Sequence, residues 1–178
     1  MTRRIDATLN DERIVAAARR VLSENPAAGM DELAHAAGVG RATLYRRFST
    51  REELLTELRA EARREALHAV KAARISEGSA TDALERLIRE LLGVADRFAF
   101  VTMQPDKRNP DPKLVKPWIE LIKRGQAAGE FTTEVSPEWS LAVIRAHFRE
   151  AAALVVAGKP LEELAALTTR AILGGLGA

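Results

Sequence analysis

Apolar residues recur along most of this chain at the three- and four-residue spacing of amphipathic helices, and no stretch of any length alternates as a β-strand does. Proline, glycine and capping residues separate the apolar segments and mark where helices begin and end. The predicted helices cover residues 11–24, 30–37, 41–48, 51–75, 81–101, 111–128, 136–157 and 161–173. The pattern predicts an all-α protein of about nine helices, with a three-helix N-terminal head and a C-terminal helical bundle.

Residues 31–55 predict two short helices joined by a tight glycine turn and followed by a third helix. Gly38 follows a helix with one apolar face, at the position where a left-handed residue commonly ends a helix. Thr50 and Glu53 form a T-x-x-E capping box that starts the next helix. A helix, a short turn and a helix with exposed basic residues make up a helix-turn-helix motif, which inserts its second helix into the major groove of DNA.

The second helix of this motif buries Leu44 and Phe48, which lie four residues apart on one side. The polar and basic side chains that remain for the outer side are Arg41, Thr43, Tyr45, Arg46 and Arg47.

These residues suggest distinct roles on DNA. An arginine paired with guanine O6 and N7 is the commonest base-specific contact, so we expect Arg46, Arg47 and Thr43 to reach base edges. Tyr45 is expected to donate its hydroxyl to a phosphate. Arg51 is expected to pair with phosphate at the start of the following helix, where backbone amides assist.

The stretch GVGRATLYRRFSTREELL resembles the DNA-binding sequence of the TetR family of bacterial repressors, and GQAAGEF at 125–131 resembles a segment of that family's second domain. Gly29 and Gly40 stand where the family commonly has a capping Ser or Thr that contacts phosphate. We expect backbone N–H groups to make contacts there. The resemblance implies a double-stranded DNA operator with two-fold symmetry, a homodimer and a small-molecule effector that releases the repressor.

Charge supports a division into a DNA-binding domain, residues 1–55, and a ligand-binding and dimerisation domain, residues 56–178. The first 50 residues hold eight arginines and six acidic residues, whereas the rest of the chain holds 19 of each sign. This positive excess is small, so two copies of the head would strengthen the attraction to DNA.

The last two predicted helices are apolar on more than one face, which requires more than one packing partner. We expect a second copy of the chain to supply one partner, forming a two-fold four-helix interface, although burial inside a monomer would also satisfy the pattern. The residues expected at this interface are Leu141, Ile144, Phe148, Val155, Leu164, Thr168 and Ile172.

The second domain also holds most of the aromatic residues, which favours either an apolar core or an effector pocket between helices. The resemblance favours the pocket, for a small apolar or amphipathic effector. Its candidate residues are Arg97, Phe98, Met103, Trp118, Trp139, Arg145, His147 and Phe148.

Other classes of function find little support in the sequence. There is no cysteine, the three histidines lie far apart, and no catalytic motif appears, so we expect neither an enzyme nor a bound metal or cofactor. No apolar run spans a bilayer and no signal peptide is evident, which predicts a cytoplasmic protein. Two alternatives to a ligand-responsive repressor remain: a DNA-binding regulator without a ligand, and a helical interaction protein that has lost DNA binding.

Overall fold

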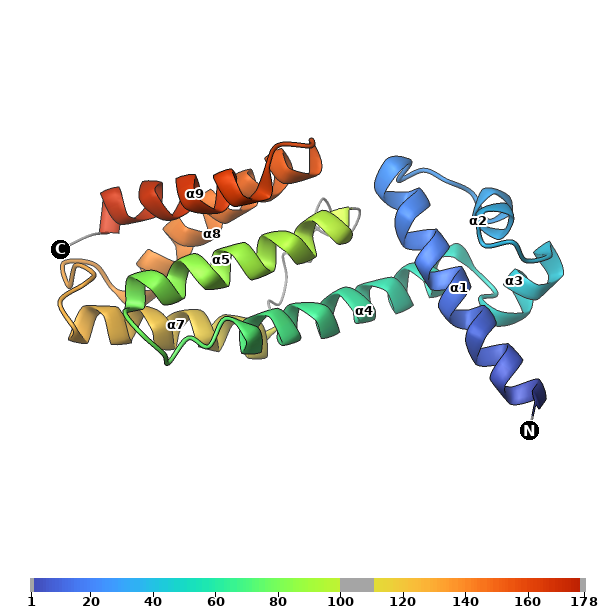
Figure 1. Cartoon of the computed structure of the whole chain (residues 1–178), viewed down its shortest axis with the longest axis horizontal. Coiled ribbons are helices and arrows are strands. Elements are labelled where there is room, and N and C mark those ends of the chain that lie inside the picture. The colour runs from blue at the N-terminus through green and yellow to red at the C-terminus, as the bar shows by residue number, and fades with distance from the viewer. Residues whose placement is uncertain (1, 100–110, 177–178) are drawn as a thin grey trace. The chain divides into compact units, whose positions relative to one another are not determined.

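The computed structural model describes residues 2–99 and 111–176, and most of these residues are helical (Figure 1). The helices are α1 (Thr2–Glu24), α2 (Met30–Ala36), α3 (Arg41–Arg47), α4 (Arg51–Ala72), α5 (Ala80–Arg97), α7 (Pro112–Ala127), α8 (Pro137–Val156) and α9 (Leu161–Leu176). The predicted all-α class is confirmed. Within the described residues, no helix is both long enough and apolar enough to cross a bilayer.

The chain forms two compact units, Met1–Arg63 and Arg64–Ala178, and the division falls inside α4. The sequence suggested a boundary at residue 55. The division lies later because the first turns of α4 belong to the first unit, where Leu54 and Leu58 are fully buried. The end of α4 leads into the second unit, where Ala73 is part of the hydrophobic core.

In the first unit, α1 begins at Thr2, well before the predicted start at Asp11. No proline or glycine interrupts residues 2–10, so the helix continues through the Asn-Asp pair that resembled a cap. Ile14, Ala18 and Leu22 form the buried stripe of α1, and α2 packs against both α1 and α3.

Polar caps set the starts of the helices in the second unit. Ser79 Oγ accepts the Asp82 N–H at 3.0 Å, and Ser136 Oγ accepts the Trp139 N–H at 3.2 Å. Asp111 Oδ1 accepts the Lys113 N–H at 2.9 Å. Each side chain satisfies an amide that has no partner within its own helix, as the Ser-Pro and Asp-Pro sequences predicted for α8 and α7.

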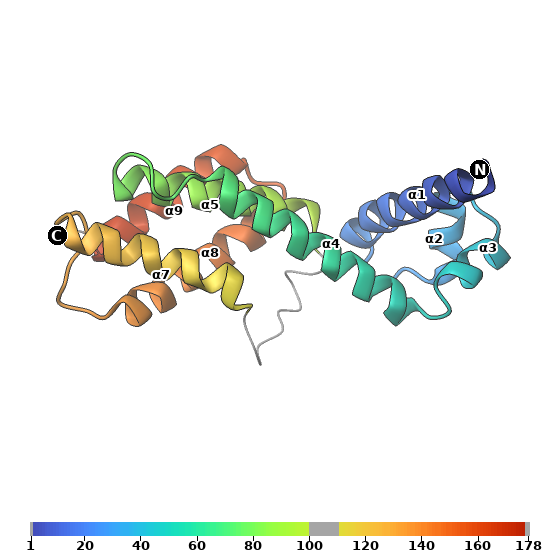
Figure 2. The ribbon, with the colours of Figure 1, turned by 90° about the horizontal axis from the view of Figure 1, so that it is seen from below.

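The core of the second unit surrounds α5, which packs against α7, α8 and α9 (Figures 1 and 2). Leu84, Leu87, Ile88 and Leu92 of α5 are fully buried, as their helical spacing predicted. Helices α8 and α9 also pack against each other.

The turn before α5 is held by charged side chains. Helix α4 ends at Ala72, short of the predicted residue 75, and the Arg86 guanidinium donates to the carbonyls of Ala73 and Glu77 at 3.0 and 2.7 Å. The carboxylate of Glu130 accepts the N–H groups of Ala80 and Thr81 at 2.8 and 2.9 Å. Glu130 therefore adds a second, long-range cap to α5, and these two backbone hydrogen bonds lower its pKa below the ordinary 4.5.

The GQAAGEF segment forms the end of α7 and the turn that follows it. Phe131 is buried, and a Cβ at Gly125 would collide with its ring, which only glycine avoids. Gln126 Nε2 donates to the carbonyls of Thr132 and Val135 at 2.9 and 3.0 Å. The segment therefore stabilises the turn after α7 and places Phe131 in the core of the second unit.

Candidate nucleic-acid interface

The turn between α2 and α3 has the geometry that the sequence predicted. Gly38 has φ of +66°, the left-handed conformation that ends α2, and its N–H donates to the His35 carbonyl at 3.0 Å. The next N–H, of Val39, donates to the Ala34 carbonyl at 3.1 Å. These bonds satisfy carbonyls at the end of α2 and turn the chain directly into α3.

Helix α3 turns one side inward and the other to solvent. Leu44 is fully buried and Phe48 is 2% exposed, so both pack into the first unit. Arg41, Tyr45 and Arg46 are exposed, and Thr43 is half-buried. The predicted inner and outer sides of this helix are therefore the ones that the structure shows.

Arg46 is the arginine of α3 whose side chain has no partner within the described part of the chain. Its side chain is exposed, and among the described residues it has neither a hydrogen bond nor an ion pair. It lies one turn after the start of α3, beside Tyr45, whose side chain is 38% exposed.

Arg41 lies against an acidic residue of the preceding helix. Its Nε is 3.0 Å from Asp31 Oδ1, and the two side chains are 68% and 64% exposed. Its guanidinium carbon also lies 5.5 Å from the centre of the Tyr45 ring, within cation–π range. Arg41 and Tyr45 therefore form one surface feature on adjacent turns of α3.

Arg47, the last residue of α3, is held more firmly. Its Nε donates to Asp11 Oδ2 of α1 at 2.7 Å, and its guanidinium carbon lies 4.6 Å from the centre of the Phe48 ring. Both partners of the ion pair are about half-exposed. This arrangement joins the end of α3 to α1.

The two ion pairs are exposed and therefore weak. Exposed pairs contribute about 0.2–1 kcal/mol each, so breaking either pair costs little. Sequence reasoning missed both acids, because neither lies at the three- or four-residue spacing that marks a helical ion pair. The arginines remain on the surface rather than inside the fold.

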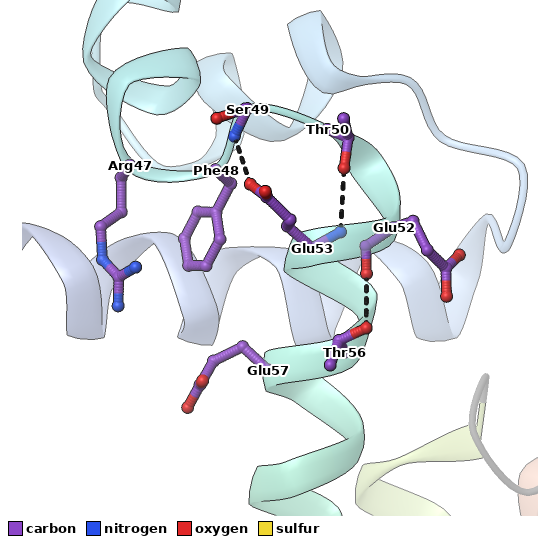
Figure 3. A pocket seen from close by; sticks show the side chains of 8 residues that line it. All are labelled: Arg47, Phe48, Ser49, Thr50, Glu52, Glu53, Thr56 and Glu57. Atoms are coloured by element: carbon purple, nitrogen blue, oxygen red, sulfur yellow. Dashed lines mark hydrogen bonds between the residues drawn. The ribbon is translucent and has the colours of Figure 1, made fainter.

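The start of α4 confirms the predicted capping box (Figure 3). Thr50 Oγ1 accepts the Glu53 N–H at 3.1 Å, and the Glu53 carboxylate accepts the Ser49 N–H at 2.7 Å. The reciprocal bond therefore goes to Ser49, one residue before the cap. An open groove of about 550 Å³ lies beside this turn, and Glu52, Glu53 and Glu57 line it together with Arg47. Three carboxylates therefore face one arginine along this groove.

Arg51, at the first position of α4, has partners that the sequence did not reveal. Its Nε donates to the Ala28 carbonyl at 3.2 Å and its Nη2 to the Pro26 carbonyl at 2.5 Å. Two of its five N–H donors are thus directed at the loop between α1 and α2.

Gly29 and Gly40 precede α2 and α3, and neither offers a side-chain cap. Both have extended backbone conformations, with φ of −83° and −67°, and both are exposed. Their surroundings leave space for a side chain.

The predicted effector residues do not form one cluster. Trp118 is buried and meets the half-buried Phe148 edge-on, with 6.4 Å between ring centres. Phe98 is fully buried, Met103 lies outside the described residues, and Arg97 pairs with Glu65 at 2.6 Å. The remaining three side chains are exposed on α8: Trp139, Arg145 and His147.

One enclosed cavity among the described residues of the second unit is small, about 10 Å³, and Ser140 is the polar residue in its lining. That volume suits at most one water molecule.

The residues predicted at a dimer interface lie mainly inside the chain's own core. Leu141, Ile144, Val155, Leu164, Thr168 and Ile172 are all buried, and Phe148 is half-buried. They pack there because α8 and α9 turn their larger apolar side chains toward α5 and each other. The opposite faces expose smaller apolar residues and two leucines: Ala142, Ala146, Ala153 and Leu154 on α8, and Leu167, Ala171 and Gly174 on α9.

Comparison with known proteins places this geometry in a family. The profile described as "Bacterial regulatory proteins, tetR family" matches residues 14–58, which run from the middle of α1 into the first turns of α4. The chain is 30% identical over 136 residues to the HTH-type transcriptional regulator NfxB of Pseudomonas aeruginosa, covering 71% of this chain and 72% of that protein. It is 33% identical over 92 residues to the HTH-type transcriptional repressor LfrR of Mycolicibacterium smegmatis, covering 52% of this chain and 49% of that repressor.

The fold of the whole chain agrees with this assignment. The crystal structure of the TetR-like regulator LfrR from Mycobacterium smegmatis in complex with proflavine has a TM-score of 0.74 at 22% identity, covering 95% of this chain and 98% of that one. The match covers 95% of this chain, so the shared fold extends into the second unit. The chain therefore belongs to the TetR family of bacterial regulatory proteins and is a DNA-binding transcriptional regulator.

Proposed function

We propose that this protein is a dimeric repressor that binds a two-fold symmetric operator through α3 and is released by a small molecule. The observation that supports it most is the outer side of α3, where Arg41, Tyr45 and Arg46 are exposed while Leu44 is fully buried. A helix anchored on one side and cationic on the other suits insertion into the major groove.

In this proposal the residues on the outer side of α3 have the DNA contacts that the sequence suggested for them. Arg46 and Thr43 face base edges, and Tyr45 donates its hydroxyl to phosphate. Arg47 contributes after exchanging Asp11 for a DNA acceptor. Two copies of the helix enter successive major grooves if their centres lie about 34–36 Å apart.

Selection of bound sites from random double-stranded DNA tests the operator. The expected result is a consensus with two-fold symmetry, because a symmetric dimer reads the same half-site twice. Recovery of asymmetric sites would contradict the symmetric dimer, and recovery of no sites would favour the interaction protein that has lost DNA binding.

The proposed dimer uses the exposed faces of α8 and α9. Leu154 is 38% exposed and Leu167 is 44% exposed, and neighbouring alanines would allow close approach of a second copy. Leu154→Glu and Leu167→Glu should convert the dimer to a monomer in sedimentation analysis, since each places a charge in an apolar interface. Lys123→Glu, an exposed change on α7, is the control.

A second candidate is a regulator without a ligand, which the close packing around the 10 Å³ cavity among the described residues would suit. An effector of the first candidate must open the packed core, which it does only by binding the open conformation more tightly. Proflavine, bound in the similar LfrR structure, is the first probe. If proflavine raises the melting temperature and releases the protein from the operator, the ligand-responsive repressor is supported. If saturating proflavine and related planar cations change neither the melting temperature nor operator binding, the second candidate is favoured.

A further inference from the structure

Arg51 lies at the start of α4 and reaches back to a segment more than twenty residues earlier in the chain. Its Nε and Nη2 donate to the carbonyls of Ala28 and Pro26, at 3.2 and 2.5 Å. The side chain is half-buried, unlike the exposed arginines of α3. The guanidinium plane therefore spans two acceptors of the loop that joins α1 and α2.

That loop determines where α2 begins. Ala28 is 1% exposed, and its carbonyl is a buried acceptor that needs a donor. Asn25 shapes the rest of the loop: its side-chain oxygen accepts the Ala27 N–H at 3.2 Å and its carbonyl accepts the Ala28 N–H at 3.0 Å. Arg51 completes this network from outside the loop.

The network bears on α3 through α2. Helix α2 packs against both α1 and α3, so a shift of its first turn would also move α3. Lysine has one nitrogen and cannot reproduce two donors held in one plane. The position therefore requires arginine for its geometry as well as its charge.

We propose that Arg51 is a positioning residue, which fastens the α1–α2 loop to the start of α4 and so orients α2 and α3 for DNA, instead of neutralising a phosphate itself. This inference rests on DNA binding by α3, and it replaces the phosphate contact that the sequence suggested for this arginine. The positioning role accounts for the half-buried guanidinium and for its hydrogen bonds to the carbonyls of Ala28 and Pro26.

The test compares Arg51→Lys with Arg51→Ala, and uses Lys123→Ala as a control that removes an exposed cation from the second unit. Fluorescence anisotropy on the selected operator gives the affinity at several KCl concentrations, and circular dichroism verifies folding. If Arg51 positions α2, both variants lose on the order of tenfold in affinity, because both lose charge-assisted hydrogen bonds. The slope of log affinity against log salt stays that of the parent protein.

A direct bond from Arg51 to phosphate gives a different pattern and would overturn the proposal. Lysine would then retain nearly the parent affinity, and alanine would reduce the salt slope by about 0.9 for each phosphate that the side chain no longer neutralises. Lys123→Ala should change neither quantity at equal protein concentration.

Hydrogen–deuterium exchange without DNA separates this inference from the proposed function. Amides of residues 28–36 should exchange faster in Arg51→Lys than in the parent, while those of α5 stay unchanged, because the loop is no longer fastened to α4. Equal exchange at residues 28–36 would refute the positioning role even if the protein binds DNA. Faster exchange in a chain that binds no DNA would support the fastening of the loop but remove the proposed function.

Discussion

Replacing Glu130 by glutamine tests whether one side chain on the turn after α7 holds the start of α5. The Glu130 carboxylate accepts two N–H groups, of Ala80 and Thr81, at 2.8 and 2.9 Å. Hydrogen bonds to a charged group contribute about 1.5–3 kcal/mol each. Glutamine keeps one acceptor oxygen, loses the charge and places an NH₂ group against an N–H. Because Glu130 is only half-buried, solvent discounts the loss, and we expect destabilisation of about 1–2 kcal/mol at neutral pH.

Acid should remove this difference. The backbone hydrogen bonds lower the pKa of Glu130 in the folded protein below its ordinary 4.5. A lowered folded pKa means that the stabilisation is complete above the unfolded pKa and is lost as pH falls through the folded value. The gap between the parent and Glu130→Gln should therefore narrow as pH drops below about 4.5.

Tryptophan fluorescence during urea unfolding is the assay. The chain has two tryptophans, Trp118 and Trp139, and both belong to the second unit, so the signal reports on that unit alone. Glu134→Gln is the matched control, because Glu134 is exposed on the same turn. Equal stability of Glu130→Gln and the parent at pH 7, or a gap that persists in acid, would refute this account of the cap.

Three further predictions concern single positions. Gly125→Ala should destabilise the second unit by about 1–3 kcal/mol, measured by the same fluorescence, because the new Cβ collides with the Phe131 ring. Gly40→Ser should stabilise the first unit by a few tenths of a kcal/mol, measured by circular dichroism, because its extended backbone and open surroundings suit a hydroxyl cap. Asp31→Asn should raise affinity for unrelated DNA sequences and make it more salt-dependent in anisotropy titrations, because Arg41 loses its acidic neighbour.

Each of these has a result that speaks against it. Unchanged stability of the second unit in Gly125→Ala would contradict the first prediction. Gly174→Ala is its control, because a Cβ there meets nothing within 4 Å. Lower stability of the first unit in Gly40→Ser would contradict the second prediction. Unaltered binding of Asp31→Asn to unrelated DNA would contradict the third, and Glu163→Gln, exposed on α9, is its control.

Local features of this chain could be predicted well from sequence. The glycine turn at Gly38, the Thr50–Glu53 box and the burial of Leu44 depend on residues within a few positions of one another. The resemblance to the TetR family depends mainly on the same stretch, and the family profile matches residues 14–58.

Long-range partners could not be predicted in this way. Arg51 meets carbonyls more than twenty residues away, and Glu130 caps a helix that begins fifty residues before it. The residues of the dimer interface on α8 and α9 were hard to predict for a related reason. Alanines and leucines occur on several faces of these helices, and spacing alone does not show which face packs inside the chain. The larger stripe, including Ile144 and Ile172, belongs to the core of the protomer.

The most direct test of the central claim is the affinity of Arg46→Ala for the selected operator, measured by fluorescence anisotropy beside Tyr45→Phe and the Lys123→Ala control. Loss of a base-contacting arginine should weaken binding by about 1–3 kcal/mol per half-site and relax the preference at one base pair. Tyr45→Phe should weaken binding with the sequence preference intact. Parent-like affinity in both variants would show that the exposed side of α3 is not the surface that meets DNA.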